Sequence, residues 1–526
     1  MVDTNNVNSD ISVKDEADVD EFLRTSATKS ARLDESEYRK HGSLIKPVLL
    51  CLATSFGGFI FGWDIGTIGG ITNMPAFQNT FGNRFDPDTG LNRFPDMLLG
   101  LIIAVFNIGC AVGGLTLAKV GDKRGRRMGI CVALGIYVIG VSIQLLHTHA
   151  WFQFFFGRII TGFSVGTSAV LVPMFVSESA PVQIRGAMVV LYQLMITFGI
   201  LLGNTVNFAC KRTIADSLSN NNWQIPIGLG IFWAAIVLAG ISFMPESAHF
   251  LAAGGRMESA RKSFAIMNSM ETTDEYVINQ VEKMSRPNIP VNVQDEPKGK
   301  WEFITGEPKL LLRLFVGIMV MAFQQLTGVN YFFYYGTTLF SSVGIEDSYI
   351  TAIILSAVNF LSTFIGIYIV ERLGRRSCLV LGSVGMFTNM AIYASIGSFA
   401  LNRDGVLPNR TAGYLMIVFT CLYIICFAST SGPVTFVVIS ELFPTRTKAI
   451  SMAICTSVNW LVNFLISLLT PTITRAIGFK YGYVFALFLF VSIFFFYALV
   501  PETKGLTIDQ VDAIYAGKKI PDESDN

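Results

Sequence analysis

Long apolar runs separated by short polar connections make up most of the chain. A helix needs about 20 apolar residues to cross a hydrocarbon core of roughly 30 Å, and only a helix satisfies its own backbone hydrogen bonds there. About twelve runs meet this length, near 46–70, 97–118, 128–147, 151–174, 187–208, 224–244, 312–334, 350–370, 377–398, 414–439, 449–470 and 481–500. The pattern predicts an all-α integral membrane protein with twelve transmembrane helices in two six-helix bundles, 45–244 and 312–500. Polar residues fill a disordered tail over 1–44, a linker over 245–311 and a second tail over 501–526.

The composition agrees with a membrane location. Hydrophobic residues make up 52% of the 526 residues and charged residues 15%, against about 25% charged in soluble proteins. The net charge of +1 leaves no positive excess for binding a polyanion, which argues against a nucleic-acid partner. The expected macromolecular environment is therefore the lipid bilayer, and no oligomer is required.

The cysteines and histidines show no pattern of a metal or redox site. Seven of the eight cysteines fall inside apolar runs and read as small core residues, and Cys210 lies near the end of a run without an obvious partner. We expect no disulfide framework, no metal site and no cofactor. The spans also lack paired catalytic carboxylates and a nucleophile elbow, so the chain is not expected to be an enzyme.

Basic residues at the ends of short connections predict the orientation. Lys and Arg cluster after the second run, over 119–127, and again after the eighth, over 372–376. Such clusters stay in the cytoplasm. An even number of spans then places both termini in the cytoplasm of a multi-pass protein of the plasma membrane. The sequon Asn409-Arg410-Thr411 falls in an outer connection, where Asn409 is a candidate for glycosylation.

Three charged motifs recur about half a chain apart. They are Gly125-Arg126-Arg127 with Gly374-Arg375-Arg376, Ser177-Glu178 and Arg185 with Ser440-Glu441 and Arg446, and Pro245-Glu246-Ser247 with Pro501-Glu502-Thr503. Each copy follows an even-numbered span, so both copies lie on one membrane face, as in a parallel repeat. The arginine pairs alone could be simple cytoplasmic anchors. Their repetition predicts a latch whose salt bridges form across the interface when the outer side is open and break when the inner side opens.

One carboxylate lies in the middle of a span. A charge at the bilayer centre costs roughly 2.5–3.5 kcal/mol on insertion scales, so such a residue is by default a functional hypothesis. Asp64 lies in the first span, and Arg158 in the fourth is its expected neutraliser. One interpretation is a static buried ion pair. The alternative is a site where a proton or a metal cation exchanges against the arginine during a transport cycle.

Neutral amides form a second group at membrane depth. A sugar that enters a dry cavity loses water from every hydroxyl, and amides replace that water because they both donate and accept hydrogen bonds. The candidates are Gln193, Gln324, Gln325, Asn330, Asn359 and Asn459, with aromatic faces at Phe61, Tyr331, Tyr334, Tyr335, Phe436 and Trp460. The alternative is that single amides join helices together.

Two positions in the second half are candidate flexing points for gating. Gln324 and Gln325 point about 100° apart on an ideal helix, so both line one cavity only where that wall is broad or distorted. Gly328 weakens this helix, and Gly432-Pro433 is expected to kink the tenth span. Tyr334 and Tyr335 are further candidates for a gate.

On these residues the sequence resembles the sugar porter family of the major facilitator superfamily, and over nearly the whole chain it is similar to the yeast hexose transporters. The resemblance is carried by Phe-Gly-Trp-Asp at 61–64, Gly-Arg-Arg at 125–127 and 374–376, Gln-Gln-Leu-Thr-Gly-Val-Asn at 324–330, Phe-Phe-Tyr-Tyr-Gly-Thr-Thr at 332–338, Glu-Leu-Phe-Pro at 441–444, Asn459-Trp460 and Pro-Glu-Thr-Lys-Gly at 501–505. It implies the major facilitator fold, alternating access, a monosaccharide bound between the halves, and short cytosolic helices within 245–311. By position it implies as sugar ligands Gln193, Gln324, Gln325, Asn330, Asn359 and Trp460.

The tenth span departs from the family pattern. Ser431 stands where relatives commonly have Trp, and Phe436 where many have Trp or another aromatic residue. The usual Pro-Glu-Ser-Pro-Arg is Pro-Glu-Ser-Ala-His at 245–249. Segments 61–70 and 432–437 are most similar to a divergent yeast branch associated with galactose, which favours galactose as the hexose, with glucose as the alternative.

Two questions stay open at the level of sequence. The resemblance covers facilitators as well as symporters, so Asp64 is compatible with facilitated diffusion and with coupling to H+ or Na+. The yeast glucose sensors share the fold, and a sensor would bind hexose and signal without transport. Sensors carry long cytosolic tails, whereas about 26 residues follow Val500 here, which favours a transporter.

Overall fold

The apolar runs form helices long enough to cross a membrane. The computed structural model describes residues 45–87, 90–146, 150–180, 185–285, 301–341, 348–401, 409–504, 506 and 508–516. Within these residues, 11 helical runs have the length and hydropathy of a span. The last run, 450–499, contains two helices in sequence, so the runs agree with the twelve predicted spans.

The first six spans form the N-terminal half. They are α2 (Ile45–Ile71), α4 (Asp96–Thr116), α6 (Arg126–Leu145), α7 (Trp151–Ser179), α8 (Arg185–Thr213) and α9 (Asn221–Ser242). Small residues bring their backbones together. A Cβ on Gly62 of α2 would overlap the carbonyl oxygen of Ile196 in α8, and one on Gly166 of α7 would overlap that of Cys110 in α4. These two glycines are therefore required for the close approach of α2 to α8 and of α4 to α7.

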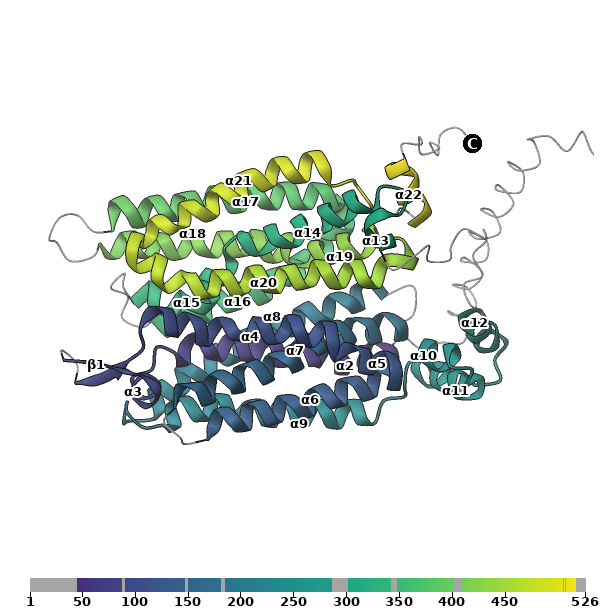
Figure 1. Ribbon diagram of the computed structural model, residues 1–526, viewed down its shortest axis with the longest axis horizontal. Coiled ribbons are helices and arrows are strands. Elements are labelled where there is room, and N and C mark those ends of the chain that lie inside the picture. The colour runs from purple at the N-terminus through teal and green to yellow at the C-terminus, as the bar shows by residue number, and fades with distance from the viewer. Residues whose placement is uncertain are drawn as a thin grey trace, which may run out of the picture.

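The remaining spans form the C-terminal half, where two of them are interrupted. The half consists of α14 (Leu310–Leu326) with α15 (Val329–Ser341), α16 (Ser348–Leu373), α17 (Arg375–Ser395) with a π turn η2 (Ile396–Ala400), α18 (Arg410–Ser429) with α19 (Ser431–Leu442), α20 (Thr445–Ile477), the 3-10 turn η3 (Gly478–Lys480) and α21 (Tyr481–Leu499). The two halves lie side by side with their helices along a common axis (Figure 1). This is the predicted architecture of two six-helix bundles.

The breaks in the seventh and tenth spans lie close to the predicted flexing points. Gly328 separates α14 from α15 at φ +86°, a conformation in which a side chain is strained, and a Cβ there would also meet the Phe485 ring at 2.5 Å. In the tenth span the break is at Thr430, with φ −130° and ψ −87°. Pro433 lies in the first turn of α19, where its missing N–H removes no helical hydrogen bond. The predicted proline kink is therefore replaced by a break just before Gly432-Pro433.

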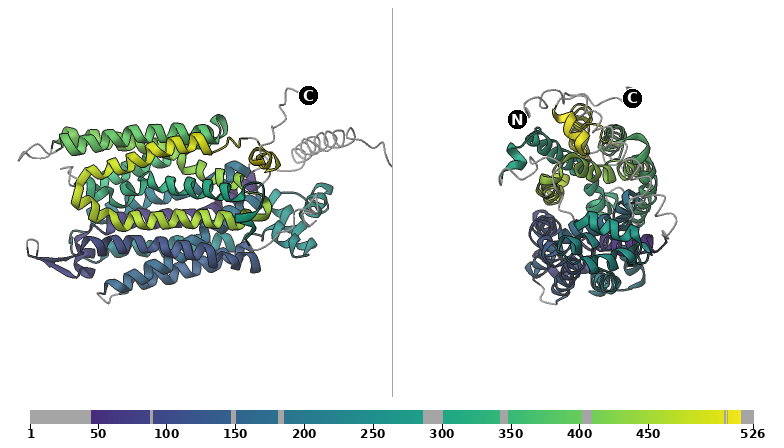
Figure 2. Two further views of the ribbon diagram at one scale, coloured as in Figure 1. Left: turned by 45° about the horizontal axis from the view of Figure 1, so that its top comes forward. Right: turned by 90° about the vertical axis from the view of Figure 1, so that its right-hand side faces the viewer.

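Short elements mark the two ends of the bundle. One end, the hairpin end, carries α3 (Pro75–Phe81) and the antiparallel pair β1 (Arg84–Asp86) and β2 (Leu91–Arg93). The opposite end, the linker end, carries α5 (Ala118–Arg124), α10 (Ala248–Ala253), α11 (Met257–Asn268), α12 (Glu275–Ser285), α13 (Glu302–Thr305) and α22 (Ile508–Ala516). Figures 1 and 2 show the two groups at opposite ends.

The halves meet along three pairs of helices. α4 lies against α20, α8 against α16, and α2 against α15. In the end view of Figure 2, the C-terminal half lies above the N-terminal half. Polar side chains on these six helices can therefore face a partner from the other half, which is where a site between the halves has to be built.

Candidate functional site

Amides of α14, α15 and α20 form a continuous hydrogen-bonded chain inside the C-terminal half. Asn459 lies between the two neighbouring glutamines: its Nδ2 donates to Oε1 of Gln324 (2.8 Å), and its Oδ1 accepts from Nε2 of Gln325 (2.9 Å). Asn330 donates to Oε1 of Gln325 (2.7 Å) and to Oδ1 of Asn463 (2.9 Å). The break at Gly328 places Asn330 in the first turn of α15, where it faces α20.

The chain of amides starts at the tenth span and ends in the other half of the molecule. Gln324 donates to the backbone oxygens of Ser431 (3.3 Å) and Gly432 (3.1 Å). At the other end, Nδ2 of Asn463 donates to Oδ1 of Asn107 on α4 (3.0 Å), across the interface between the halves. Six amides from four helices are thus linked. Such a set offers hydroxyl groups both donors and acceptors without charge.

Aromatic rings from the two halves meet on residues that neighbour the amides in sequence, since Phe106 precedes Asn107 and Trp460 follows Asn459. The rings of Phe61 on α2 and Trp460 on α20 are edge to face, with centroids 5.4 Å apart. Phe61 also stacks on Phe106 of α4, at 6.5 Å and an interplanar angle of 16°. Aromatic faces beside bifunctional amides match a ligand that carries hydroxyls on its edge and C–H groups on its faces.

The charged pair predicted in the N-terminal half is present. Arg158 on α7 donates Nη1 to Oδ2 of Asp64 on α2, and both side chains are buried. The guanidinium also lies over the ring of Phe106, 4.5 Å from its centroid. A small enclosed space adjoins the pair, lined among others by Tyr137 and Gln144. One ring, Phe106, therefore touches both the ion pair and the aromatic group at the interface.

Three predicted ligands lie apart from the amide chain. Asn359 is buried on α16, and Gln193 is half-buried on α8. Phe436 on α19 is 44% exposed, and the contacts between described residues do not connect it to the amides. The structure therefore gathers only part of the predicted set into one network.

The tyrosines predicted to form a gate belong to a group of contacts towards the hairpin end. Tyr334 is buried, and Tyr335 donates its hydroxyl to the backbone oxygen of Ser467 on α20 (2.7 Å). Between the halves, Asn73 donates to Oγ1 of Thr337 (2.7 Å), and Tyr349 of α16 donates to the backbone oxygen of Gly70 (2.9 Å). This end of the interface is held together by hydrogen bonds from both halves.

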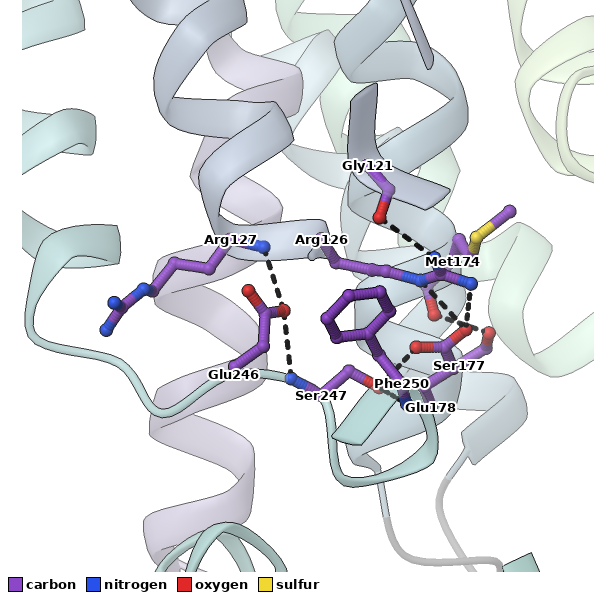
Figure 3. A network of polar contacts seen from close by, with 9 residues as sticks. All are labelled: Gly121, Arg126, Arg127, Met174, Ser177, Glu178, Glu246, Ser247 and Phe250. Atoms are coloured by element: carbon purple, nitrogen blue, oxygen red, sulfur yellow. Dashed lines mark hydrogen bonds and ion pairs between the residues drawn. The ribbon is translucent and has the colours of Figure 1, made fainter. Parts of the chain in front are cut away.

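At the linker end, the repeated motifs of the N-terminal half form one network (Figure 3). Arg126 contacts Oε1 of Glu178 at 3.2 Å, and Ser247 donates its hydroxyl to the other oxygen of that carboxylate. Glu246 accepts from the backbone N–H of Arg127 (3.0 Å), which caps the N-terminus of α6. The motif thus ties the ends of α6 and α7 to the segment before α10.

The C-terminal half repeats this network. Arg375 contacts Glu441 at 2.9 Å, Thr503 donates to Glu441 (2.5 Å), and Glu502 accepts from the backbone N–H groups of Arg375 (2.8 Å) and Arg376 (3.1 Å). These contacts correspond to those of the first half, which supports the internal repeat. Burial lowers the pKa of Lys448 at the start of α20, and the nearby charge of Glu441 partly offsets this effect.

In this conformation, the Arg–Glu pairs of the repeated motifs, Arg126–Glu178 and Arg375–Glu441, each lie within one half. The sequence predicts salt bridges across the interface only when the outer side is open, so the latch stays a prediction. The halves are joined instead towards the hairpin end, so the linker-end motifs have partners inside each bundle. The side chains of Arg185 and Arg446 lie outside the described residues.

The candidate glycosylation site is exposed next to a helix start. Asn409 precedes α18, and its Oδ1 accepts from the backbone N–H groups of Thr411 (3.0 Å) and Ala412 (3.4 Å). The side chain is therefore an N-cap. It leaves Nδ2, the atom that a glycan would modify, outside this capping contact.

Sequence reasoning missed two residues of the amide chain. Asn463 lies one helical turn after Asn459 on α20, a spacing that places both on one face. Asn107 interrupts the apolar second span. The criterion that selected the other amides, a polar side chain at membrane depth, applies to both and would have found them.

The chain matches a known family over most of its length. The family model described as "Sugar (and other) transporter" matches residues 50–515. The hexose transporter HXT14 of Saccharomyces cerevisiae is 47% identical over 490 residues, 90% of each chain. A low-affinity glucose transporter of Kluyveromyces lactis is 43% identical over 518 residues, 98% of this chain and 89% of the relative.

Solved structures share the fold at lower identity. The xylose transporter XylE from E. coli in an inward open conformation has a TM-score of 0.71 at 23% identity, over 89% of this chain and 99% of its own. The proton:xylose symporter XylE bound to 6-bromo-6-deoxy-D-glucose has a TM-score of 0.73 at 24% identity, over 90% of this chain and 100% of its own. These matches establish the fold.

Proposed function

Because the chain belongs to the sugar transporter family of the major facilitator superfamily, we propose that it carries a hexose across the plasma membrane by alternating access, with galactose as the preferred sugar. Family membership makes the chain a carrier and not an enzyme. The observation that carries the proposal is the chain of amides from Gln324 to Asn107, which spans the interface between two halves of matching architecture.

The chemistry of the interface supports a hydroxyl-rich ligand. Asn330, Asn459 and Asn463 are linked by neutral hydrogen bonds, directly or through Gln325, and sugar hydroxyls can exchange with these bonds at little net cost because donors and acceptors are matched. The edge-to-face pair of Phe61 and Trp460 would cover a C–H face of the ring. We assign three further residues to the same site in the sugar-bound conformation, namely Gln193 of the N-terminal half and Asn359 and Phe436 of the C-terminal half.

The residues of the tenth span are the reason for proposing galactose as the preferred sugar. Ser431 offers its backbone oxygen to Gln324, and its side-chain hydroxyl is a buried oxygen without a partner among the described residues. A small polar residue here leaves more room beside the sugar than the Trp that relatives commonly have. The relatives described above are transporters of hexose or of glucose, so glucose is the competing substrate.

Competition between sugars tests this preference. Labelled galactose uptake would be measured in cells without other hexose carriers, with glucose, xylose and fructose as competitors. We expect galactose to be taken up with the lowest KM. Glucose outcompeting galactose manyfold would overturn the preference while leaving a hexose carrier in place.

The orientation and energetics complete the proposal. The linker end is assigned to the cytoplasm with both termini, and the hairpin end and Asn409 to the outside, on the positions of the basic clusters. Asp64 and Arg158 are proposed as the coupling site if transport is driven by H+ or Na+, and as a fixed ion pair if the protein is a facilitator. A sugar sensor of the same fold would bind hexose without moving it.

A further inference from the structure

We infer that Asn107 on α4 is a hydrogen-bond donor to a hydroxyl of the transported sugar, contributed by the N-terminal half. The inference rests on the proposed function and adds one ligand to its site. It starts from an imbalance in the amide chain: among the six linked amides, Asn107 has a buried Nδ2 without a partner in the described structure.

A buried donor without an acceptor is costly. Asn107 is 1% exposed, and a buried N–H group without an acceptor loses its hydrogen bonds to water and gains none from the protein. Most buried polar groups are satisfied, so each exception calls for an explanation. A partner that is present only in part of the transport cycle, such as a sugar hydroxyl, is an explanation that fits the place of this residue.

The surroundings hold the amide in position. Oδ1 of Asn107 accepts from Nδ2 of Asn463, which fixes the plane of the amide and leaves Nδ2 as the free end. Two residues along α4, a Cβ on Gly109 would overlap the backbone oxygen of Ile159 in α7. Because α4 packs this closely on α7, the backbone at Asn107 cannot shift to bring the side chain to another acceptor.

The burial of Asn107 matches that of its neighbours in the chain of amides. Asn459 and Asn463 are 4% and 2% exposed, so the part of the chain next to Asn107 is closed to solvent in this conformation, while Gln325 is half-buried. Nε2 of Gln325 and Nδ2 of Asn330 already donate to protein oxygens, whereas Nδ2 of Asn107 donates to none among the described residues. A sugar hydroxyl bound to Asn107 therefore satisfies a buried donor that otherwise lacks an acceptor.

The competing interpretation is a fixed bridge between the halves. Asn204 on α8 offers a matched control, because its Nδ2 donates to Oγ of Ser356 on α16 (2.8 Å), also across the interface but outside the amide chain. A bridge affects every sugar equally. A ligand affects only sugars that carry the hydroxyl it binds.

The test compares deoxy sugars on three proteins. The full-length wild type, Asn107→Ala and Asn204→Ala are reconstituted in vesicles, and uptake of labelled hexose is competed by its 2-, 3-, 4- and 6-deoxy derivatives. For the wild type we expect one deoxy derivative to compete about 5- to 100-fold more weakly than the parent hexose. In Asn107→Ala the KM for the parent hexose should rise by a similar factor, and that one derivative should compete as strongly as the parent hexose. Asn204→Ala should keep the wild-type pattern.

Each other outcome counts against the inference. If Asn107→Ala weakens the binding of the parent hexose and of every derivative by the same factor, as the loss of a fixed bridge would, Asn107 is not a ligand. If Asn107→Ala does not fold, Asn107→Ser replaces it, because serine keeps a small hydrogen-bond donor. Asn107→Ser should change how strongly the same derivative competes with the parent hexose. Competition identical to that of the wild type for every derivative overturns the inference. A wild type that neither binds nor moves hexose removes the proposed function itself, and this result is distinct from a uniform loss in the variant.

Discussion

Phe61 and Trp460 come from opposite halves of the molecule and meet edge to face, with ring centroids 5.4 Å apart. Phe61 belongs to α2 and Trp460 to α20, so this contact must change whenever the halves rotate against each other. Trp460 follows Asn459 of the amide chain in sequence. We therefore propose that this contact takes part both in binding the ligand and in the movement of the halves.

We predict that Trp460→Ala raises the KM for the preferred hexose by about tenfold, because an aromatic pair and its apolar cover contribute about 0.5–1.5 kcal/mol beyond area burial. Phe490→Leu on α21 is the control, since that ring is 45% exposed and lies outside the interface helices. Initial rates of labelled sugar uptake would measure both. An unchanged KM in Trp460→Ala would remove this residue from the site.

The buried ion pair makes a second prediction. Asp64→Asn leaves the guanidinium of Arg158 buried without its counter-charge, which is strongly destabilising. We expect net uptake to fall at least about tenfold, while Asp86→Asn serves as a control for loss of a paired carboxylate outside the spans, because Asp86 lies in the β hairpin and pairs with the exposed Arg93. Normal uptake by Asp64→Asn would show that transport does not need the buried pair of Asp64 and Arg158.

Energetics can be separated from stability at the same site. Asp64→Asn with Arg158→Gln removes both charges, so the protein should regain exchange of labelled for unlabelled sugar. Uptake by the wild type and this double variant is then measured against external pH and with sodium replaced. If the wild type accumulates sugar and the double variant does not, transport is coupled to an ion. If uptake by the wild type depends on neither external pH nor sodium, the protein is a facilitator.

The glycines of the two Gly-Arg-Arg motifs should be important for stability. Gly125 and Gly374 have φ values of +108° and +85°, and a Cβ on them would overlap the carboxylates of Glu246 and Glu502. Alanine at either position should destabilise the linker end by about 1–3 kcal/mol. Gly135→Ala is the matched control, because a Cβ at that position would have no atom within 4 Å. Thermal unfolding of the purified variants should show a lower midpoint for the first two only.

A further prediction concerns the contact between α14 and α22. Arg313 at the start of α14 is fully buried, contacts Asp512 of α22 at 2.5 Å, and lies 4.5 Å from the ring centroid of Tyr515. Burial raises the pKa of Tyr515 to about 12. Asp512→Ala removes the carboxylate that neutralises this buried guanidinium, and we expect α22 to be released from the bundle.

Hydrogen exchange measures this release directly. Amides of α22 should exchange about tenfold or more faster in Asp512→Ala, with α21 unchanged. Glu258→Ala is the control, because the exposed pair of Glu258 with Lys262 on α11 holds no other helix in place. Equal exchange in wild type and Asp512→Ala would show that apolar contacts alone hold α22.

The spans and the repeat could be predicted from sequence because both follow from one-dimensional patterns. Runs of apolar residues place the helices, and the offset of the Gly-Arg-Arg motifs pairs the halves. The pairing of Asp64 with Arg158 was also accessible, because a buried charge requires a partner and the spans contain few candidates.

The geometry of the amides required the structure. Gln324 and Gln325 point in different directions on a helix, and the sequence could not show that Asn459 fits between them and binds both. Nor could it show that the latch residues pair within each half in this conformation, since the partner of Arg126 depends on which end of the interface is closed. The sequence marks Asn107 as a polar residue in an apolar span, but only the structure shows that its oxygen is bonded across the interface while its Nδ2 has no partner among the described residues.

A carrier whose two six-helix halves alternate around an amide-lined hexose site should exchange sugar across a membrane. Counterflow measures this exchange: vesicles containing purified protein are loaded with unlabelled hexose, and the entry of labelled hexose is followed with time. We predict a transient overshoot of labelled galactose that disappears without protein. Saturable binding of the sugar with no entry into the vesicles would contradict a carrier and identify a receptor.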